Sequence, residues 1–336
     1  MSATAAPALV VRGLSHRYRR ADRAALDEVS FEVEAGEIFG VLGPNGGGKT
    51  TLFRILATLL RPRAQRNGRP TLEVFGRDVL RDPAGVRATL GVVFQQPSLD
   101  GKLTARENLR HHGRLYGLCG GELEQAIDAS LARFDLGERG GERVERFSGG
   151  MRRRVELAKA MLTRPHVLLM DEPATGLDPA ARRALWAQLE TLRAEAGVTL
   201  VLTTHLMDEA ARCDRLAIIA EGRLVTVDAP AALTARIGGD VVTLELRAAA
   251  GDADAANVAD VAGAIGERFG PWAPGGEPRV IEGGVIRCER EDGAKLVAEI
   301  GAAFGGRIAR MSVGQPTLED VFVHLTGRGF EGERVF

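Results

Sequence analysis

The segment from Glu37 to Leu60, EIFGVLGPNGGGKTTLFRILATLL, constrains the fold of this chain more than any other part of it. It places an apolar strand, a glycine-rich turn and an apolar helix in direct succession. The turn, GPNGGGKT from Gly43 to Thr50, fits the pattern G-x-x-x-x-G-K-[ST]. In this context the pattern builds a phosphate site, because backbone N–H groups at a helix N-terminus converge on phosphate oxygens. We therefore expect an α/β domain that binds a phosphorylated ligand.

Two side chains of this turn have specific expected roles. Lys49 would bring a compact positive charge to the β- and γ-phosphates, and Thr50 would supply a hydroxyl ligand for Mg²⁺. The alternative glycine motif, G-x-G-x-x-G of dinucleotide-binding proteins, is absent here, and no acidic residue stands at the expected strand end. The sequence therefore favours a site for a nucleoside triphosphate over a dinucleotide site or an ordinary glycine-rich turn.

Three later strands end in polar residues. GVVFQ ends at Gln95, VLLMDEP carries Asp171 and Glu172, and VTLVLTTH ends at His205. Two carboxylates at the tip of a buried strand are costly unless a metal or water meets them. Asp171 is therefore a candidate Mg²⁺ ligand, and Glu172 is a candidate for polarising an attacking water. Gln95 or His205 alone could be structural, but in parallel strands both would lie over the same phosphate-facing edge.

The stretch RFSGGMRRR, from Arg146 to Arg154, places a serine and two glycines before a strongly helical run. A helix N-terminus with an exposed serine and two amides free of side chains is a second anion site. It could bind a γ-phosphate presented by another molecule. The three arginines step around the helix by about 100° each, so they cannot form one flat nucleic-acid patch and at least one must point inward or sideways. We favour the Ser-Gly-Gly turn as the functional part.

The chain has 336 residues, which suits two domains. Apolar strands alternate with helices up to about residue 228, a pattern typical of a mostly parallel sheet covered on both faces. A capping box of Thr104 and Glu107 begins a helical region that extends to Phe134. We place the first domain at residues 8–228, with a helical subdomain at about residues 96–150.

Residues 229–336 have a different pattern and form a second predicted domain. Their order of strand, helix, strand, strand, helix and strand matches a small ferredoxin-like α+β unit, with a hairpin turn at Gly283 and Gly284. The last helix should dock on another surface, because it carries an apolar face of Leu318, Val321, Phe322 and Leu325.

Composition limits the partners and the compartment. The net charge of −1 argues against a dedicated nucleic-acid binder. The cysteines Cys119, Cys213 and Cys288 are widely spaced and match no metal-ligand pattern, which indicates a reducing cytosol. The N-terminus lacks a signal-peptide pattern, and no apolar run approaches the ~20 residues needed to span a bilayer. We expect a cytoplasmic protein that serves a membrane only through a partner.

Together these motifs resemble the ATP-binding subunit of an ABC transporter, over about residues 8–228 and in the family's order and spacing. In that family two cassettes pair head to tail, and each ATP lies between the P-loop of one copy and the signature turn of the other. The resemblance implies a P-loop NTPase fold of ABC type, with a mostly parallel sheet, N-terminal antiparallel strands and a helical subdomain, followed by the small C-terminal α+β domain.

The resemblance also implies roles for individual residues. Tyr18 would stack on adenine, Glu172 would be the catalytic base, His205 the γ-phosphate switch, and Asp178 a member of the cross-dimer loop. Lys49 joins Glu172 and His205 as catalytic residues. The Mg²⁺ ligands would be Thr50, Gln95 and Asp171. The remaining nucleotide-binding residues would be Gly43, Pro44, Asn45, Gly46, Gly47, Gly48 and Thr51 in the P-loop, and Phe147, Ser148, Gly149, Gly150 and Met151 in the signature turn.

Small departures from the family pattern leave the chemistry intact. The signature reads FSGGM where LSGGQ is commonest, and Gly47 replaces the more usual Ala or Ser. Neither change removes a phosphate-facing amide or a catalytic carboxylate, so both sites of a dimer should hydrolyse ATP. The FSGGMRRR form and the ending PTLEDVFVHLTGR, Pro316 to Arg328, are similar to the branch containing daunorubicin/doxorubicin-resistance exporters.

The resemblance therefore implies an ATPase subunit that dimerises around two ATP molecules with Mg²⁺. It would pair with itself or with a related cassette, and it would drive a separate integral membrane permease from the cytoplasmic face of the cell membrane. The helical region from Thr104 to Phe134, with the segment after Gln95, would contact the permease. The transported substrate is not readable, because its site would lie in the permease.

Two other classes were weighed. The first is a soluble ABC ATPase acting on nucleic acid or ribosomes, whose members carry a long coiled coil or a second cassette that this chain lacks. The second is a nucleotide-gated binding module without useful turnover. The presence of Glu172 and His205 argues against that second class.

Overall fold

The computed structural model describes residues 6–63, 68–247, 255–269, 279–281, 285–290 and 292–326. The chain divides into two compact units. The first unit consists of residues 1–206 and 213–227, and the second consists of residues 207–212 and 228–336. Among the described residues, no helix combines the length and apolar character that crossing a membrane requires.

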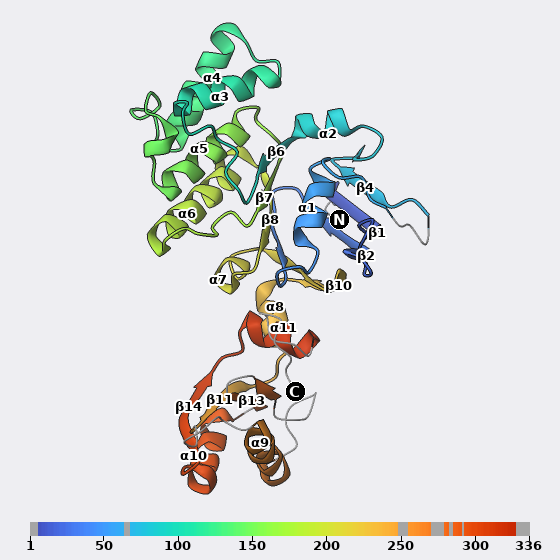
Figure 1. Ribbon diagram of the computed structural model, residues 1–336, viewed down its shortest axis with the longest axis vertical. Helices are drawn as coiled ribbons and strands as arrows, with labels where there is room; N and C mark the ends of the chain where they lie inside the picture. Colours follow the sequence, from blue (N-terminus) through green and yellow to red (C-terminus); the bar gives the residue numbers. More distant parts are fainter. Residues whose placement is uncertain are drawn as a thin grey trace, which may run out of the picture. The chain divides into compact units, whose positions relative to one another are not determined.

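A six-stranded sheet forms the centre of the first unit, in the order β10-β9-β3-β8-β7-β6. Its strands are β3 (Ile38–Leu42), β6 (Leu90–Val93), β7 (Val167–Asp171), β8 (Thr199–Thr204), β9 (Arg215–Ala220) and β10 (Arg223–Asp228). The pairs β9–β3, β3–β8, β8–β7 and β7–β6 are parallel. Every residue of β3, β7 and β8 is buried, because both faces of the sheet are covered. Helix α1 lies on one side of it, and α5 and α6 lie on the other (Figure 1).

An antiparallel sheet packs against α1 (Lys49–Leu56) and completes the larger core. Its order is β2-β1-β4-β5, with β1 (Leu9–His16), β2 (Leu26–Val33), β4 (Thr71–Val74) and β5 (Arg77–Asp78). The N-terminal antiparallel strands are therefore confirmed. Strands β4 and β5 and helix α2 (Pro83–Thr89) were not predicted, because they are too short to show a periodic apolar pattern.

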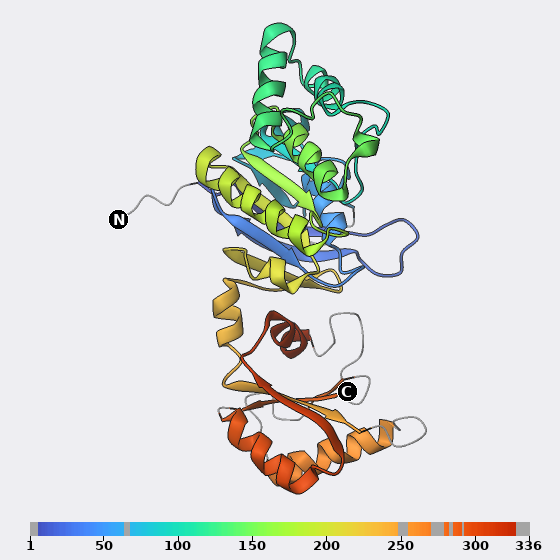
Figure 2. The same ribbon diagram turned by 90° about the vertical axis from the view of Figure 1, so that its left-hand side faces the viewer.

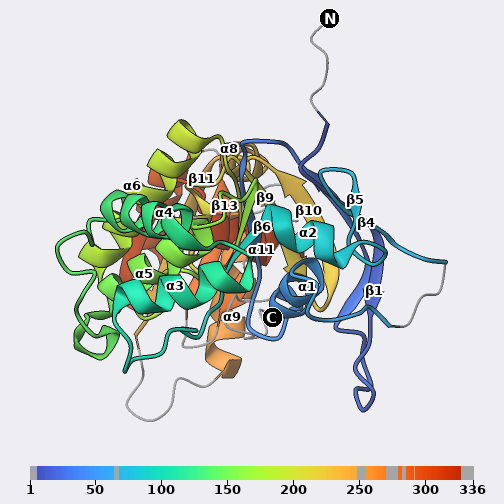
Figure 3. The ribbon, with the colours of Figure 1, turned by 90° about the horizontal axis from the view of Figure 1, so that it is seen from above.

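The helices α3 (Ala105–Leu115), α4 (Gly120–Arg133) and α5 (Gly149–Met161) pack on one another, and α6 (Pro179–Ala196) follows β7 (Figure 3). The predicted capping box begins α3. Glu107 N donates to Thr104 Oγ1 at 3.1 Å, and Thr104 N donates to Glu107 Oε2 at 2.8 Å. These reciprocal bonds satisfy two amides that a helix start otherwise leaves unpaired.

The second unit contains the predicted ferredoxin-like order. It comprises β11 (Asp240–Leu246), α9 (Ala255–Phe269), β12 (Arg279–Ile281), β13 (Val285–Arg290), α10 (Gly293–Phe304) and β14 (Ile308–Gly314), with the sheet order β12-β13-β11-β14. Both helices cover the same face of this sheet (Figure 2). Val242 and Leu244 of β11 pack there against Ile265 of α9 and Ile300 of α10. The predicted turn at Gly283 and Gly284 lies outside the described residues.

Three further helices belong to the second unit: α7 (Met207–Ala210), α8 (Pro230–Ala235) and α11 (Leu318–Thr326). Helix α11 packs on α8 and α7. Leu318, Val321 and Phe322 are buried, so the apolar face predicted for the last helix does have a docking surface.

His112 of α3 makes the stability of the first unit depend on pH. Burial, aided by the positive charge of Lys159 in α5, lowers the pKa of His112 to about 4. As the pH falls, His112 is therefore protonated near pH 6.5 in the unfolded chain but only near pH 4 in the folded chain. The resulting contribution to stability is complete above pH 6.5 and is lost as the pH falls towards 4.

We predict that lowering the pH from about 7.5 to about 5 costs wild type about 1–2 kcal/mol through this group. His112→Gln should abolish that part of the pH dependence, as measured by urea unfolding at both pH values. His111→Gln, a change at the exposed neighbour on the same helix, is the matched control and should behave like wild type. Equal pH dependence in His112→Gln and wild type would contradict the prediction.

Candidate functional site

The glycine-rich turn connects β3 to α1 and packs closely against the start of β2. Gly48 immediately precedes α1 with a φ of 107°, a conformation that favours glycine. A Cβ atom at Gly48 would lie only 2.4 Å from the carbonyl oxygen of Ala25. The turn is further held by the N–H of Gly222, which donates to the Gly47 carbonyl at 3.1 Å. The turn thus opens onto the first amides of α1, which can bind an anion.

Lys49 is buried beneath this turn. Its Nζ donates to the carbonyl oxygens of Gly43 at 2.7 Å and Pro44 at 3.1 Å, and it lies 3.6 Å from Glu172 Oε1. Burial lowers the pKa of Lys49, whereas the charge of Glu172 opposes that effect. The Lys49 side chain is therefore held between the glycine-rich turn and the carboxylate of Glu172, the residue that follows β7.

Asp171 is the last residue of β7 and lies opposite Thr203 of β8 in the sheet register. Thr203 Oγ1 donates to Asp171 Oδ1 at 2.5 Å. Burial raises the pKa of Asp171, and the hydrogen bond from Thr203 and the nearby Thr50 hydroxyl oppose that rise. Two of the three predicted Mg²⁺ ligands, Thr50 and Asp171, therefore lie near each other.

Glu172 is the point at which the predicted catalytic residues meet. Gln95 Nε2 donates to Glu172 Oε2 at 2.9 Å, and His205 Nδ1 lies 3.3 Å from the same oxygen. Lys49 approaches the other carboxylate oxygen. Glu172 is only 6% exposed and has a φ of 47°, a strained backbone conformation that is held by hydrogen bonds from its N–H to Thr203.

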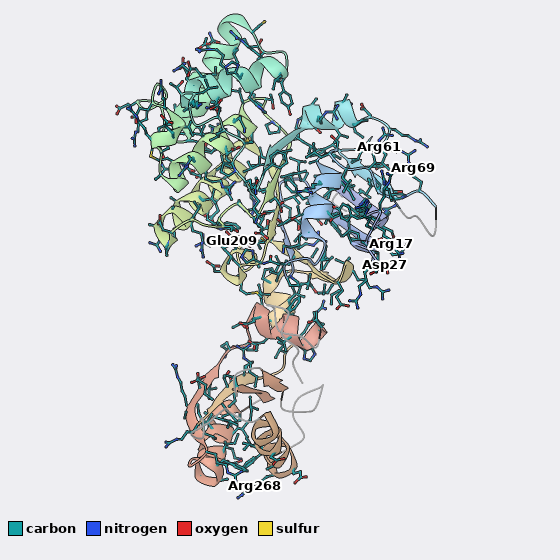
Figure 4. All side chains as sticks on the ribbon, viewed as in Figure 1. Arg17, Asp27, Arg61, Arg69, Glu209 and Arg268 are labelled. Atoms are coloured by element: carbon teal, nitrogen blue, oxygen red, sulfur yellow. The ribbon has the colours of Figure 1, made fainter. Side chains whose placement is uncertain are left out.

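Tyr18 lies beside α1 with its ring partly open to solvent. Its hydroxyl is 3.2 Å from Thr51 Oγ1, and its ring meets His16 edge-on at 4.7 Å between centroids. The loop that carries Tyr18 lies between Arg17 and Asp27, which Figure 4 labels. The ring is 40% exposed, so it can stack on a planar group bound next to the turn.

The predicted signature residues form a separate group. Ser148, Gly150 and Met151 line a cavity of about 380 Å³ together with Asp178, and no residue of the turn from Gly43 to Thr51 lines that cavity. Ser148 caps α5 by accepting from the N–H of Met151 at 3.3 Å. Asp178 caps α6 by accepting from two backbone amides at 2.9 Å. Both side chains therefore have a structural role in addition to any ligand contact.

Phe147, the first signature residue, packs into the protein. It is buried, and the Arg139 guanidinium carbon lies 5.5 Å from its ring centroid.

Two threonines that were not predicted from the sequence also hold the site. Thr203 binds both the Asp171 carboxylate and the Glu172 amide, and the Thr175 hydroxyl donates to Glu172 Oε2 at 3.3 Å. The signal available for Thr203 was its position in VTLVLTTH, two residues before His205.

Comparisons with known proteins point to one family. The family model described as "ABC transporter" matches residues 26–175. The daunorubicin resistance ATP-binding protein DrrA3 of Streptomyces coeruleorubidus is 38% identical over 323 residues, which cover 95% of this chain and 96% of that protein. The Nod factor export ATP-binding protein I of Sinorhizobium fredii is 38% identical over 91% of this chain and 83% of its own length.

A solved structure extends the comparison to the fold. The cbiO1 protein of Clostridium perfringens, part of the ABC transporter complex cbiONQ, aligns with a TM-score of 0.62 and 26% identity. The alignment covers 68% of this chain and 91% of that one. The predicted fold class is therefore confirmed.

The close approach at Gly48 makes a direct prediction about the turn. Gly48→Ala should lower the free energy of unfolding by about 2–4 kcal/mol, because the new methyl group must displace the Ala25 backbone and the left-handed φ adds strain. Gly46→Ala is the matched control. Its φ of 77° is also left-handed, but nothing lies within 4 Å of the added Cβ, so we expect a loss of only about 1 kcal/mol. Denaturant unfolding without nucleotide measures both, and equal losses would contradict the packing argument.

Proposed function

Because the chain belongs to the ATP-binding proteins of ABC transporters, an ATPase family, we propose that two copies close around two ATP molecules and drive export through a separate membrane permease. The observation that carries the proposal is the convergence of Gln95 and His205 on one oxygen of Glu172, with Lys49 on the other. A base, a phosphate-binding cation and two polar groups thereby meet next to the phosphate-binding turn.

In this proposal each contact has a role in ATP hydrolysis. The turn and Lys49 bind the β- and γ-phosphates, and Tyr18 stacks on adenine. Glu172 accepts a proton from the attacking water at a carboxylate oxygen. Gln95 and His205, which already contact that carboxylate, orient it and the γ-phosphate. Because burial keeps bulk water away from Glu172, the position of its carboxylate is set by these neighbours.

The donor set also fits Mg²⁺. The ion prefers hard oxygen ligands, and the hydroxyl of Thr50, the carboxylate of Asp171 and the side-chain oxygen of Gln95 are of that kind. Thr50 lies close enough to Asp171 to affect its pKa, which supports the two as ligands of one ion. When bound with ATP, Mg²⁺ would neutralise phosphate charge.

The Ser148 turn supplies the reason to invoke a second copy. It begins a 13-residue helix whose first amides can bind an anion, yet the cavity that it lines contains no residue of the phosphate-binding turn. A second chain, related by a two-fold axis, would present its ATP to this turn, with Asp178 beside the contact. The partner is another copy of this chain or a related cassette.

Export, instead of import, is favoured by the relatives. The Sinorhizobium fredii protein is named for Nod factor export, and the Streptomyces coeruleorubidus protein for daunorubicin resistance. We propose that this chain likewise acts as an exporter ATPase, peripheral on the cytoplasmic face of the membrane. In this proposal residues 8–228 form the ATP-binding domain and residues 229–336 an accessory domain.

A groove on the first unit is the proposed permease contact. It has a volume of about 430 Å³ and is lined by residues that include Leu59, Leu115 and Tyr116. These side chains are 59%, 84% and 42% exposed, a large apolar surface for a protein exterior. An exposed apolar groove between helices suits a short amphipathic helix, so we propose that a cytoplasmic helix of the permease binds here. The groove includes part of the predicted contact region, from Thr104 to Phe134.

The role of Glu172 is tested by Glu172→Gln. This change keeps the size and one hydrogen-bond acceptor of the side chain but removes its basicity. ATP affinity should stay within about threefold, turnover should fall by about 10³-fold, and a dimer should accumulate with ATP. Phosphate release, nucleotide binding and light scattering measure the three effects. Rapid phosphate release by the variant would exclude Glu172 as the base, and a variant that stays monomeric with ATP would contradict the paired arrangement.

The role of the groove is tested by Leu115→Asp. The charge should prevent an apolar helix from docking. The stimulation of the ATPase by permease-containing vesicles should therefore fall by about tenfold, whereas basal activity should persist. Val313→Asp introduces the same charge at an exposed valine of β14 and serves as the control. If Leu115→Asp retains full stimulation, the groove is not the permease contact.

A further inference from the structure

The inward-pointing arginine of the RFSGGMRRR stretch is Arg153. It is 7% exposed, whereas Arg152 is exposed and Arg154 lies 3.6 Å from Asp135. Arg153 Nη1 donates to the Phe94 carbonyl at 2.9 Å, and Nη2 donates to the Gln95 carbonyl at 3.5 Å. The expectation that at least one of the three arginines points inward or sideways is therefore confirmed.

These carbonyls explain why Gln95 does not end a strand. The sequence predicted a strand from Gly91 to Gln95, but β6 ends at Val93. Beyond that point a helix side chain, not a neighbouring strand, binds the backbone of Phe94 and Gln95. A guanidinium suits the task, because its planar group presents several donors and can hold two carbonyls at once.

Helix α5 holds the same segment again at Ser98. Glu156, which is almost fully buried, accepts hydrogen bonds from the Ser98 N–H and from Ser98 Oγ at 3.1 Å. Lys159 pairs with Glu156 at 2.9 Å and also donates to Ser98 Oγ. Three buried charged side chains of one helix thus bind both ends of the segment from Phe94 to Ser98. Breaking either attachment leaves a buried charge short of a partner, so the segment should follow the helix when the helix moves.

Helix α5 and the attached segment from Phe94 to Ser98 connect two places that, in our proposal, lie beside different ATP molecules. The N-terminus of α5 is the Ser148 turn, which in our proposal binds the ATP held by the partner copy. Gln95, at the other end, contacts Glu172 at this chain's own ATP site. Ser98 and Lys159 also line the proposed permease groove. An α-helix transmits a displacement along its axis with little internal change, because every turn is hydrogen-bonded to the next.

We infer that Arg153 is a positioning residue that couples the two ATP sites. Contact of the partner's γ-phosphate with the Ser148 turn moves α5, and Arg153 then moves Gln95 relative to Glu172. Hydrolysis at one site thereby depends on ATP at the other. This inference rests on the paired arrangement under Proposed function and adds the side chain that carries the signal.

The test compares Arg153→Gln and Arg153→Lys with Arg152→Gln, a matched control at the exposed neighbour. For each full-length variant, the ATPase rate is measured against ATP concentration, and ATP affinity is measured by direct binding. Because two ATP molecules close one dimer, wild type should show a Hill coefficient above 1. Arg153→Gln should keep its ATP affinity within about threefold, lose kcat by at least about tenfold, equivalent to about 1.4 kcal/mol, and lose cooperativity.

Arg153→Lys can hold only one of the two carbonyls, so its kcat and Hill coefficient should be intermediate. Arg152→Gln should behave like wild type. Wild-type kcat and cooperativity in Arg153→Gln, or in Arg153→Lys if Arg153→Gln does not fold, would overturn the inference. Loss of ATP binding in parallel with kcat would also overturn it, because that result indicates a general structural role.

A double variant distinguishes failure of this inference from failure of the proposed function on which it rests. Glu172→Gln alone tests the dimer, and Glu172→Gln combined with Arg153→Gln tests the coupling. If Glu172→Gln forms no ATP-dependent dimer, the paired arrangement fails. If it does, the double variant should form that dimer with ATP affinity near that of Glu172→Gln. A double variant that cannot dimerise would show that Arg153 is needed to form the interface and does not transmit its closure. In that case the coupling inference would fail, whereas the paired arrangement would stand.

Discussion

The buried carboxylate of Glu172 is the interaction on which the site depends. A carboxylate removed from water is costly unless other groups compensate its charge and fill its hydrogen-bonding capacity. Lys49 supplies the charge, Gln95 supplies a hydrogen bond, and His205 lies within 3.3 Å. These partners come from three separate segments of the chain. The parallel sheet must therefore be in register before these side chains can meet.

The signature helix α5 extends this dependence away from the phosphates. Its N-terminus carries Ser148, and its buried face binds the backbone that leads to Gln95. One helix thus connects the Ser148 turn, whose cavity contains no residue of the turn from Gly43 to Thr51, to Gln95, which binds the Glu172 carboxylate. The same helix reaches the apolar groove through Lys159. In the proposed function, ATP hydrolysis and permease contact would therefore both depend on α5.

Much of the architecture could be predicted because local patterns decide it. The turn from Gly43 to Thr50, the capping box at Thr104 and the strand ending in Asp171 each depend on residues close together in sequence. The ferredoxin-like order also followed from element type alone. The strand predicted through Gln95 was too long, because its carbonyls bind Arg153 from a segment about 60 residues away. No periodicity in GVVFQ carries that information.

By itself, the sequence determined which strands lead to polar residues at one edge of the sheet and which turn could bind an anion, because strand and helix periodicity and glycine placement act over a few residues. Only the tertiary structure decided that Thr203 binds both Asp171 and the Glu172 backbone, and that Arg153 is the arginine facing inward. The reason is physical: those contacts depend on register between strands and on which face of a helix becomes buried. Both are fixed by packing across the whole unit.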